Sequence, residues 1–117
     1  MTVEAFWDSS DDELFARLGA GLLGEGLGIS PDEQESHRRF GMTWFANKRR
    51  DLQQIVCHAE VMQGLLGTSR SDRIIDAAAV YELLQENGHD PVNAAVLAVL
   101  IARVGLGAFC ATAPPKS

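Results

Sequence analysis

The stretch from Ala94 to Ala111 constrains the fold of this chain most strongly. Every residue in it is apolar or glycine, apart from Arg103. Asp90 and Pro91 precede it and form a helix start. The Asp90 side chain can cap the helix, and Pro91 fits the first helical position because its missing amide has no helical hydrogen-bond partner there. A helix that is apolar all round belongs at the centre of a bundle, in a protein interface or in a membrane. We therefore expect a C-terminal helix that other elements surround.

A membrane location for this stretch is disfavoured. Eighteen residues are close to the minimum length for a spanning helix. Arg103 near its centre would cost about 2.5–3.5 kcal/mol on insertion scales, and Gly105 and Gly107 weaken the span further. The sequence therefore predicts a soluble protein in which the C-terminal helix is buried, with no membrane among its expected partners.

Two further segments carry strong helix-start signals. Ser9 or Ser10 precedes three acids at residues 11–13, and Ser30-Pro31 precedes two acids. A serine oxygen caps free backbone amides, and acids in the first turn are stabilised by the positive end of the helix. The first helix should span roughly residues 10–24, and the second should begin at residue 31.

Apolar residues recur at three- and four-residue steps from Phe40 to Leu66, which predicts helical structure. Lys48 falls within this apolar stripe. Either Lys48 lays its stem over the core with its head in water, or the segment breaks near Asn47 into two helices. We favour a break, since one helix over residues 31–66 would be long for a chain of 117 residues.

One more helix is predicted before the Asn87-Gly88 turn, and no segment has the alternating pattern of a strand. Its buried face should carry Ile74, Ala78, Tyr81 and Leu84. The predicted fold class is all-α, a compact bundle of four to five helices with a buried hydrophobic C-terminal helix. Residues 1–113 should form a single helical domain, and residues 114–117 a short flexible tail.

Cysteine usage and the N-terminal sequence predict a cytoplasmic protein. Cys57 and Cys110 are too few for the disulfide framework of a small secreted domain, so reduced, buried thiols are expected. The N-terminus carries acids where an export signal needs bases.

No residue set in the sequence has the spacing of a catalytic, metal or cofactor site. The cysteines and histidines match no recognised metal-ligand spacing, and His37 and His89 stand in polar surroundings where we expect them to be exposed. The glycine-rich residues 21–28 follow no strand and precede no Gly-Lys-Ser/Thr, so they do not resemble a phosphate-binding loop. We therefore predict a non-enzymatic protein without metal or cofactor.

Charged residues form an acidic group near the N-terminus and a basic group in the middle of the chain. The predicted acidic interaction surface consists of Asp8, Asp11, Asp12 and Glu13, and the predicted basic one of Arg38, Arg39, Lys48, Arg49 and Arg50. Either the two groups neutralise each other within the fold, or they join neighbouring molecules.

The favoured function is a helical protein–protein interaction module, an adaptor or assembly subunit that binds a protein partner or a second copy of itself. One alternative is a bundle that binds a small apolar ligand or serves as an accessory subunit of an enzyme; its cavity would be lined by Trp44, Phe45, Tyr81 and Phe109. Nucleic acid is a less favoured partner. The net charge is −6, and although Arg38 and Arg49 share a face if their helix is continuous, no aromatic residue is interleaved for base stacking.

Overall fold

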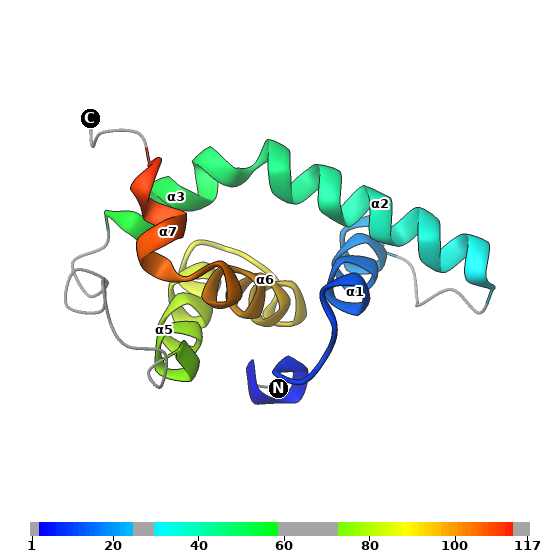
Figure 1. Cartoon of the computed structure of the whole chain (residues 1–117), viewed down its shortest axis with the longest axis horizontal. Helices are drawn as coiled ribbons and strands as arrows, with labels where there is room; N and C mark the ends of the chain where they lie inside the picture. Colours follow the sequence, from blue (N-terminus) through cyan, green and yellow to red (C-terminus); the bar gives the residue numbers. More distant parts are fainter. Residues whose placement is uncertain (1–2, 25–29, 59–72, 114–117) are drawn as a thin grey trace.

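The computed structural model describes residues 3–24, 30–58 and 73–113, and every regular element in these ranges is a helix (Figure 1). The predicted all-α bundle is therefore confirmed. The predicted tail, residues 114–117, lies outside the described residues, as do positions 59–66 of the apolar stripe. The elements in chain order are η1 (Val3–Phe6, a short 3-10 helix), α1 (Asp11–Leu23), α2 (Pro31–Asn47), α3 (Arg49–Cys57), α5 (Arg73–Glu86), α6 (Pro91–Val104) and α7 (Leu106–Ala111).

The helix starts form as predicted because local side chains cap them. Ser10 accepts a hydrogen bond from the Glu13 amide at 3.1 Å, and the Ser10 amide donates to the Glu13 carboxylate at 3.2 Å. This reciprocal pair satisfies two amides that the first turn leaves without helical partners. Ser30 caps α2 in the same way, accepting from the Glu33 amide at 3.1 Å. Gly24 ends α1 with a φ of 71°, a conformation that favours glycine.

The predicted break near Asn47 is confirmed at Lys48, which joins α2 to α3. The Lys48 amide donates to the Trp44 carbonyl, and the Leu52 amide donates to the Lys48 carbonyl, both at 2.9 Å. Lys48 also keeps a negative φ of −96°, so the junction is a kink and not a turn. The two helices form one bent rod across the top of Figure 1.

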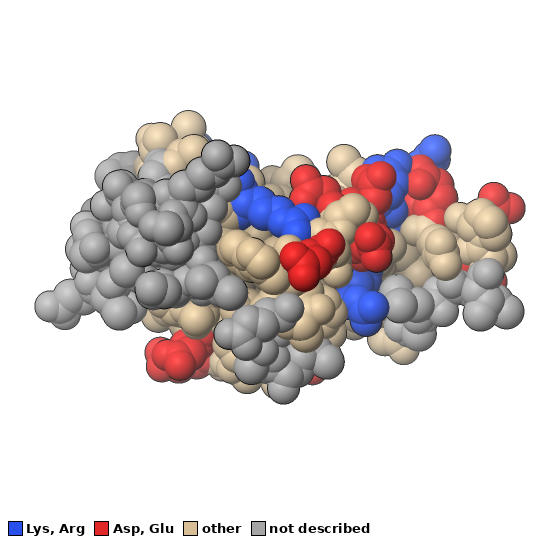
Figure 2. All heavy atoms as spheres, turned by 60° about the horizontal axis from the view of Figure 1, so that its bottom comes forward, with Lys and Arg blue, Asp and Glu red and all other residues tan. Residues whose placement is uncertain are grey.

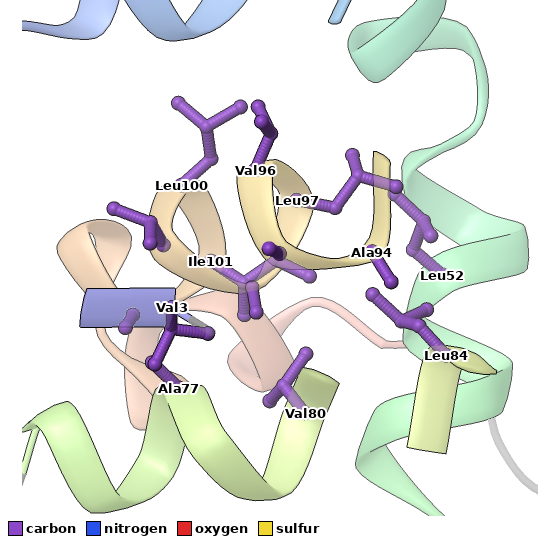
Figure 3. Close-up of a cluster of buried hydrophobic side chains, with 14 of the residues drawn as sticks. Val3, Leu52, Ala77, Val80, Leu84, Ala94, Val96, Leu97, Leu100 and Ile101 are labelled. Carbon is purple, nitrogen blue, oxygen red and sulfur yellow. The ribbon is translucent and has the colours of Figure 1, made fainter. Parts of the chain in front are cut away.

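Helix α6 is the centre of the bundle. All nine residues from Ala94 to Ala102 are buried, and α6 contacts α1, α5, α7 and η1. Figure 3 shows how its sides differ: Ile101 points towards residues of η1 and α5, Leu97 lies near Leu52 of α3, and Val96 and Leu100 point away from α5. The prediction of a helix surrounded by other elements is thus confirmed.

The apolar stretch after Pro91 is two helices and not one, which makes six α-helices in the described ranges instead of four to five. Gly105 divides it with a φ of 96°, outside the right-handed helical region. Arg103 therefore lies in the last turn of α6 and not near the middle of a long helix. Within the residues described, no helix is long and apolar enough to cross a membrane.

The predicted buried face of α5 is wrong in part. Ala77, Val80 and Leu84 are buried, whereas Ala78 is exposed and Tyr81 is half-buried. Residues 77–81 are all apolar or aromatic, so they lie on every side of the helix. Their spacing alone therefore does not determine which face is buried. Packing against α6 and η1 selects the face that is covered.

Helices α1 and α2 approach closely through two glycines. A Cβ atom added at Gly19 would overlap the His37 carbonyl, and one added at Gly41 would overlap the Phe15 carbonyl. His37 lies on the same face of α2 as Gly41 and is only 4% exposed, so the prediction that it is exposed is wrong. Polar neighbours in the sequence misled that prediction, because residues on other faces of a helix do not determine burial.

Candidate functional site

Most of the predicted acidic surface is used within the fold. Arg103 donates to the Asp11 carboxylate at 2.8 Å and to the Trp7 carbonyl at 2.7 Å, which ties the N-terminal segment to the end of α6. Asp12 lies 3.8 Å from the Arg38 guanidinium. The Glu13 carboxylate belongs to the α1 cap, and its pKa is lowered chiefly because it accepts the Ser10 backbone amide. Asp8 is exposed.

Arg38 and Arg39 of the predicted basic surface are paired on their own helix. Both donate to Glu35, Arg38 at 2.6 Å and Arg39 at 2.9 Å. These hydrogen bonds, with that from Arg38 the larger cause, hold the pKa of Glu35 at about 2. The Arg38 pKa is raised in turn, mainly by its hydrogen bonds to Glu35. This part of the predicted surface is neutralised locally.

The rest of the predicted basic surface lies at the kink between α2 and α3, and we call Lys48, Arg49 and Arg50 the basic block. Lys48 is exposed and only loosely paired with Asp51, at 3.8 Å. The Arg49 guanidinium lies 5.0 Å from the centre of the Phe109 ring. Arg50 is exposed and makes no ion pair with any described residue.

The kink also affects the prediction that Arg38 and Arg49 share one helix face, because that prediction required a continuous helix. In the structure the helix breaks between them, and their side chains contact different elements, Glu35 on α2 and Phe109 on α7. That nucleic acid is an unlikely partner stays a prediction.

A second acidic feature, which the sequence analysis did not select, lies at the start of α2. Asp32 and Glu33 are exposed there, and neither carboxylate is paired with a described base. We call Asp32 and Glu33, in the first turn of α2, the acidic end. The capping role of Asp32 and Glu33 fully explained their presence in the sequence, so no further signal identified them.

A groove of about 420 Å³ lies between α1 and α2. Its lining mixes both charges with small side chains: Asp12, Glu13, Ala16, Arg17, Pro31, Gln34, Glu35 and Arg38. Figure 2 shows acidic and basic side chains interleaved over the half of the molecule that holds α1 and α2. The groove is therefore a charged surface feature, unlike the apolar cavity expected for a hydrophobic ligand.

The aromatic residues proposed for an apolar cavity take different positions. Phe45 and Phe109 are buried and stack with ring centres 6.5 Å apart, and Phe15 meets Phe45 edge to face at 6.0 Å. Trp44 and Tyr81 are half-buried against this core. The rings of Phe45 and Phe109 thus pack against each other. Binding of an apolar ligand stays a prediction.

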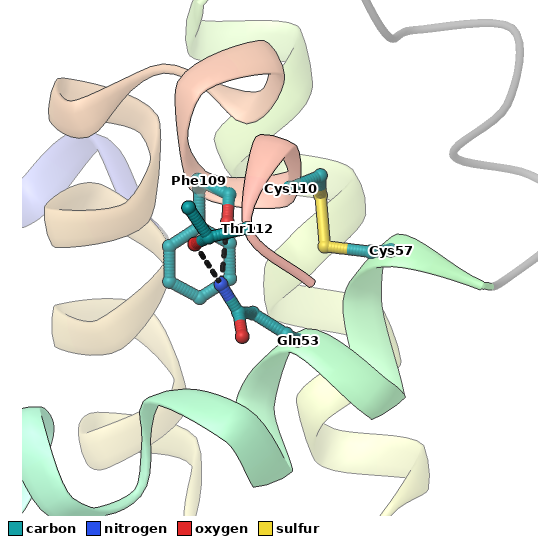
Figure 4. Close-up of a disulfide and its surroundings, with 5 residues drawn as sticks. All are labelled: Gln53, Cys57, Phe109, Cys110 and Thr112. Carbon is teal, nitrogen blue, oxygen red and sulfur yellow. Dashed lines mark hydrogen bonds between the residues drawn. A yellow bond between two sulfur atoms is a disulfide. The ribbon is translucent and has the colours of Figure 1, made fainter. Parts of the chain in front are cut away.

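Cys57 and Cys110 form a disulfide between the end of α3 and α7, so the prediction of two reduced thiols is wrong (Figure 4). Their Cα atoms are 5.5 Å apart although 53 positions separate them in the sequence. Beside the disulfide, the buried Gln53 side chain donates to the Phe109 carbonyl at 2.7 Å and to the Thr112 hydroxyl at 3.1 Å. Sequence reasoning missed Gln53; its four-residue steps to Arg49 and Cys57 were the available signal.

The described residues contain no cluster of three or more histidine, cysteine, aspartate or glutamate side chains that could hold a metal ion. Cys57 is bonded to Cys110 and is not a free thiol nucleophile. His89, expected to be exposed, is half-buried, and this burial lowers its pKa. The absence of metal, cofactor and enzymatic activity stays a prediction.

A scan against protein-family models and searches of curated proteins and of solved structures found no match to this chain.

Proposed function

We propose that the chain is a self-associating helical module, in which the acidic end of one copy docks on the basic block of the next. One observation carries this proposal: the two surfaces are opposite in charge, exposed in large part, and separated along the bent α2–α3 rod (Figure 1). A second copy of the chain can therefore offer its basic block to the acidic end of the first copy, and its acidic end to the basic block.

The separation supports pairing between molecules over pairing within one. From Asp32 to Lys48 along α2 the rise is about 24 Å, at 1.5 Å per residue. The Debye length at physiological ionic strength is about 8 Å. Charges this far apart are largely screened from each other, so Asp32 and Glu33 gain little from the basic block of their own chain. Direct contact with the block of a second copy removes that separation.

The expected association is reversible and sensitive to salt. An exposed ion pair contributes roughly 0.2–1 kcal/mol, so several pairs must act together. Complementary charges contribute more to specificity and to the rate of encounter than to affinity. Because the two surfaces differ, the contact is head-to-tail, and it extends into a chain or closes into a ring.

Sedimentation velocity at rising protein concentration tests the proposal. We expect species larger than the monomer at low salt and only monomer at about 1 M salt, where the Debye length is about 3 Å. The basic-block variant Lys48→Glu/Arg50→Glu and the acidic-end variant Asp32→Lys/Glu33→Lys should each be monomeric alone. Mixing the two should restore association, because every reversed surface then meets a complementary one.

The matched control is Glu82→Lys/Glu86→Lys on α5. Both glutamates are exposed and belong to neither surface, and this variant changes the net charge as much as the acidic-end variant does. It should associate like the natural chain. A natural chain that stays monomeric at low salt, or a mixture that stays monomeric when each variant is folded by circular dichroism, would contradict the proposal.

A cytoplasmic location stays a prediction as well. The Cys57–Cys110 disulfide counts against this location, because cytosolic proteins usually keep their thiols reduced.

A further inference from the structure

We propose that the Cys57–Cys110 disulfide is a reducible latch, which holds α7 against α3 and is opened by a dithiol reductant. Its opening lets α7 leave the core and frees Arg49 of the basic block. The latch itself is independent of the proposed self-association; only its effect on the basic block rests on that function.

Helix α7 depends on its neighbours for stability. It has six residues, far fewer than an isolated helix needs in water. Gly105, with its positive φ, separates α7 from α6, so no helical hydrogen-bond ladder runs unbroken from one to the other. Contacts with α3 and α6 are therefore what keeps α7 in place.

One face of α3 supplies the contacts that hold α7. Arg49, Gln53 and Cys57 follow at four-residue steps. Arg49 lies over the Phe109 ring, Gln53 donates to the Phe109 carbonyl and the Thr112 hydroxyl, and Cys57 is bonded to Cys110. Figure 4 shows the disulfide beside the Gln53 hydrogen bonds.

The disulfide is the one covalent member of this set, and it controls whether the others can separate. While it is intact, α7 cannot move away from the end of α3. Once it is reduced, only non-covalent contacts oppose separation: the Gln53 hydrogen bonds, the Arg49 contact with the Phe109 ring and the burial of Phe109. Helix α7 then becomes a local unit with its own opening equilibrium. Opening exposes Phe109, which is fully buried in the closed state.

The two cysteine residues differ in exposure. Cys57 is 5% exposed, whereas Cys110 is half-buried. One thiolate of the reductant attacks Cys110 Sγ, forms a mixed disulfide and releases the Cys57 thiolate, which takes up a proton. The second thiol of the reductant then displaces Cys110, which is protonated in turn. Two electrons and two protons pass from the dithiol to the protein, and the reductant leaves as its own disulfide.

Opening also changes the basic block. In the closed state the Arg49 guanidinium lies over Phe109, while Lys48 at the α2–α3 junction and Arg50 on α3 are exposed. When Phe109 departs, all three basic side chains are available to the acidic end of another copy. The reduced protein should therefore associate more strongly than the oxidised protein at low salt.

Hydrogen exchange of the full chain, oxidised and after reduction with dithiothreitol, tests the latch. We expect amides of α7 to exchange at least about tenfold faster after reduction, which corresponds to about 1.4 kcal/mol in the opening free energy. Amides of α1, which is distant from the disulfide, should change much less. The Cys57→Ser/Cys110→Ser variant should behave like the reduced protein without any reductant.

Two exchange results would overturn the proposal. Unchanged exchange in α7 would mean that the other contacts suffice to hold it, and equal acceleration of α1, α6 and α7 would mean that the disulfide stabilises the whole fold and is no local latch. Sedimentation in both redox states tests the regulatory part. Faster α7 exchange with unaltered association would refute that part, whereas the mixing of charge-reversed variants tests the self-association separately.

Discussion

Helices α2 and α6 are stabilised in different ways. In α6, nine consecutive residues are buried, whereas in α2, with seventeen residues, only His37, Gly41 and Phe45 are. Removal of apolar surface from water stabilises α6 on every side. Helix α2 has a capped start, the Glu35 ion pairs on its surface and one close crossing with α1.

This difference indicates where the chain tolerates change. A helix that is covered all round has no free face, and any alteration of its volume is felt by the core. A helix that is buried along a narrow stripe presents most of its surface to solvent or to a partner. Helix α2 therefore carries the acidic end and leads directly to the basic block.

The largest effect is expected in α6. Leu97→Ala should lower the free energy of unfolding by about 3 kcal/mol, because Leu97 is fully buried and truncation leaves a cavity. The same substitution at Leu23, which is 44% exposed, is the matched control and should cost less than about 1 kcal/mol. Denaturant unfolding measures both, and equal losses at the two positions would contradict the central placement of α6.

An intermediate effect is expected where α2 crosses α1. Gly41→Ala should cost roughly 1–3 kcal/mol, since its Cβ would meet the Phe15 backbone and the two helices would have to separate. Alanine is otherwise the better helix former. The control is Thr43→Ala, at an exposed position of the same helix. If Gly41→Ala stabilised the protein in thermal unfolding, the close approach of the two helices would be wrong.

The smallest effect is expected on the surface of α2. The pKa of Glu35 is lowered from 4.5 to about 2, so this carboxylate stabilises the fold above about pH 4.5 and loses that contribution as the pH falls towards 2. The Glu35→Gln variant should show a weaker loss of stability over this range, and Glu82→Gln serves as the control. A carboxyl titration of Glu35 by NMR near its ordinary pKa would show that Arg38 and Arg39 do not hold it.

Features that depend on residues within one helical turn were predictable. Ser10 and Ser30 cap their helices as expected, because the atoms they bind lie only three residues away. The break at Lys48 was predictable for a related reason, since a lysine interrupted the apolar stripe there. The division at Gly105 was missed, because a glycine within an apolar run is compatible with a helix as well as with its end.

Features that join distant residues were not predictable. The candidate surfaces illustrate this: Asp8, Asp11, Asp12 and Glu13 look equivalent in the sequence, yet Asp11 is bound by Arg103 from the end of α6. Arg49 and Arg50 are adjacent, yet only Arg49 lies over Phe109. Which charges remain available to a partner is thus decided by elements far away in the chain.

The sequence by itself determined that the chain is helical, where α1 and α2 begin, and that the helix after Pro91 must be covered, because caps and apolar periodicity act over a few residues. The tertiary structure alone decided the Cys57–Cys110 bond, the covered face of α5 and the burial of His37. These features depend on which elements pack side by side. The sequence of one helix does not specify its neighbours when several of its faces could be buried.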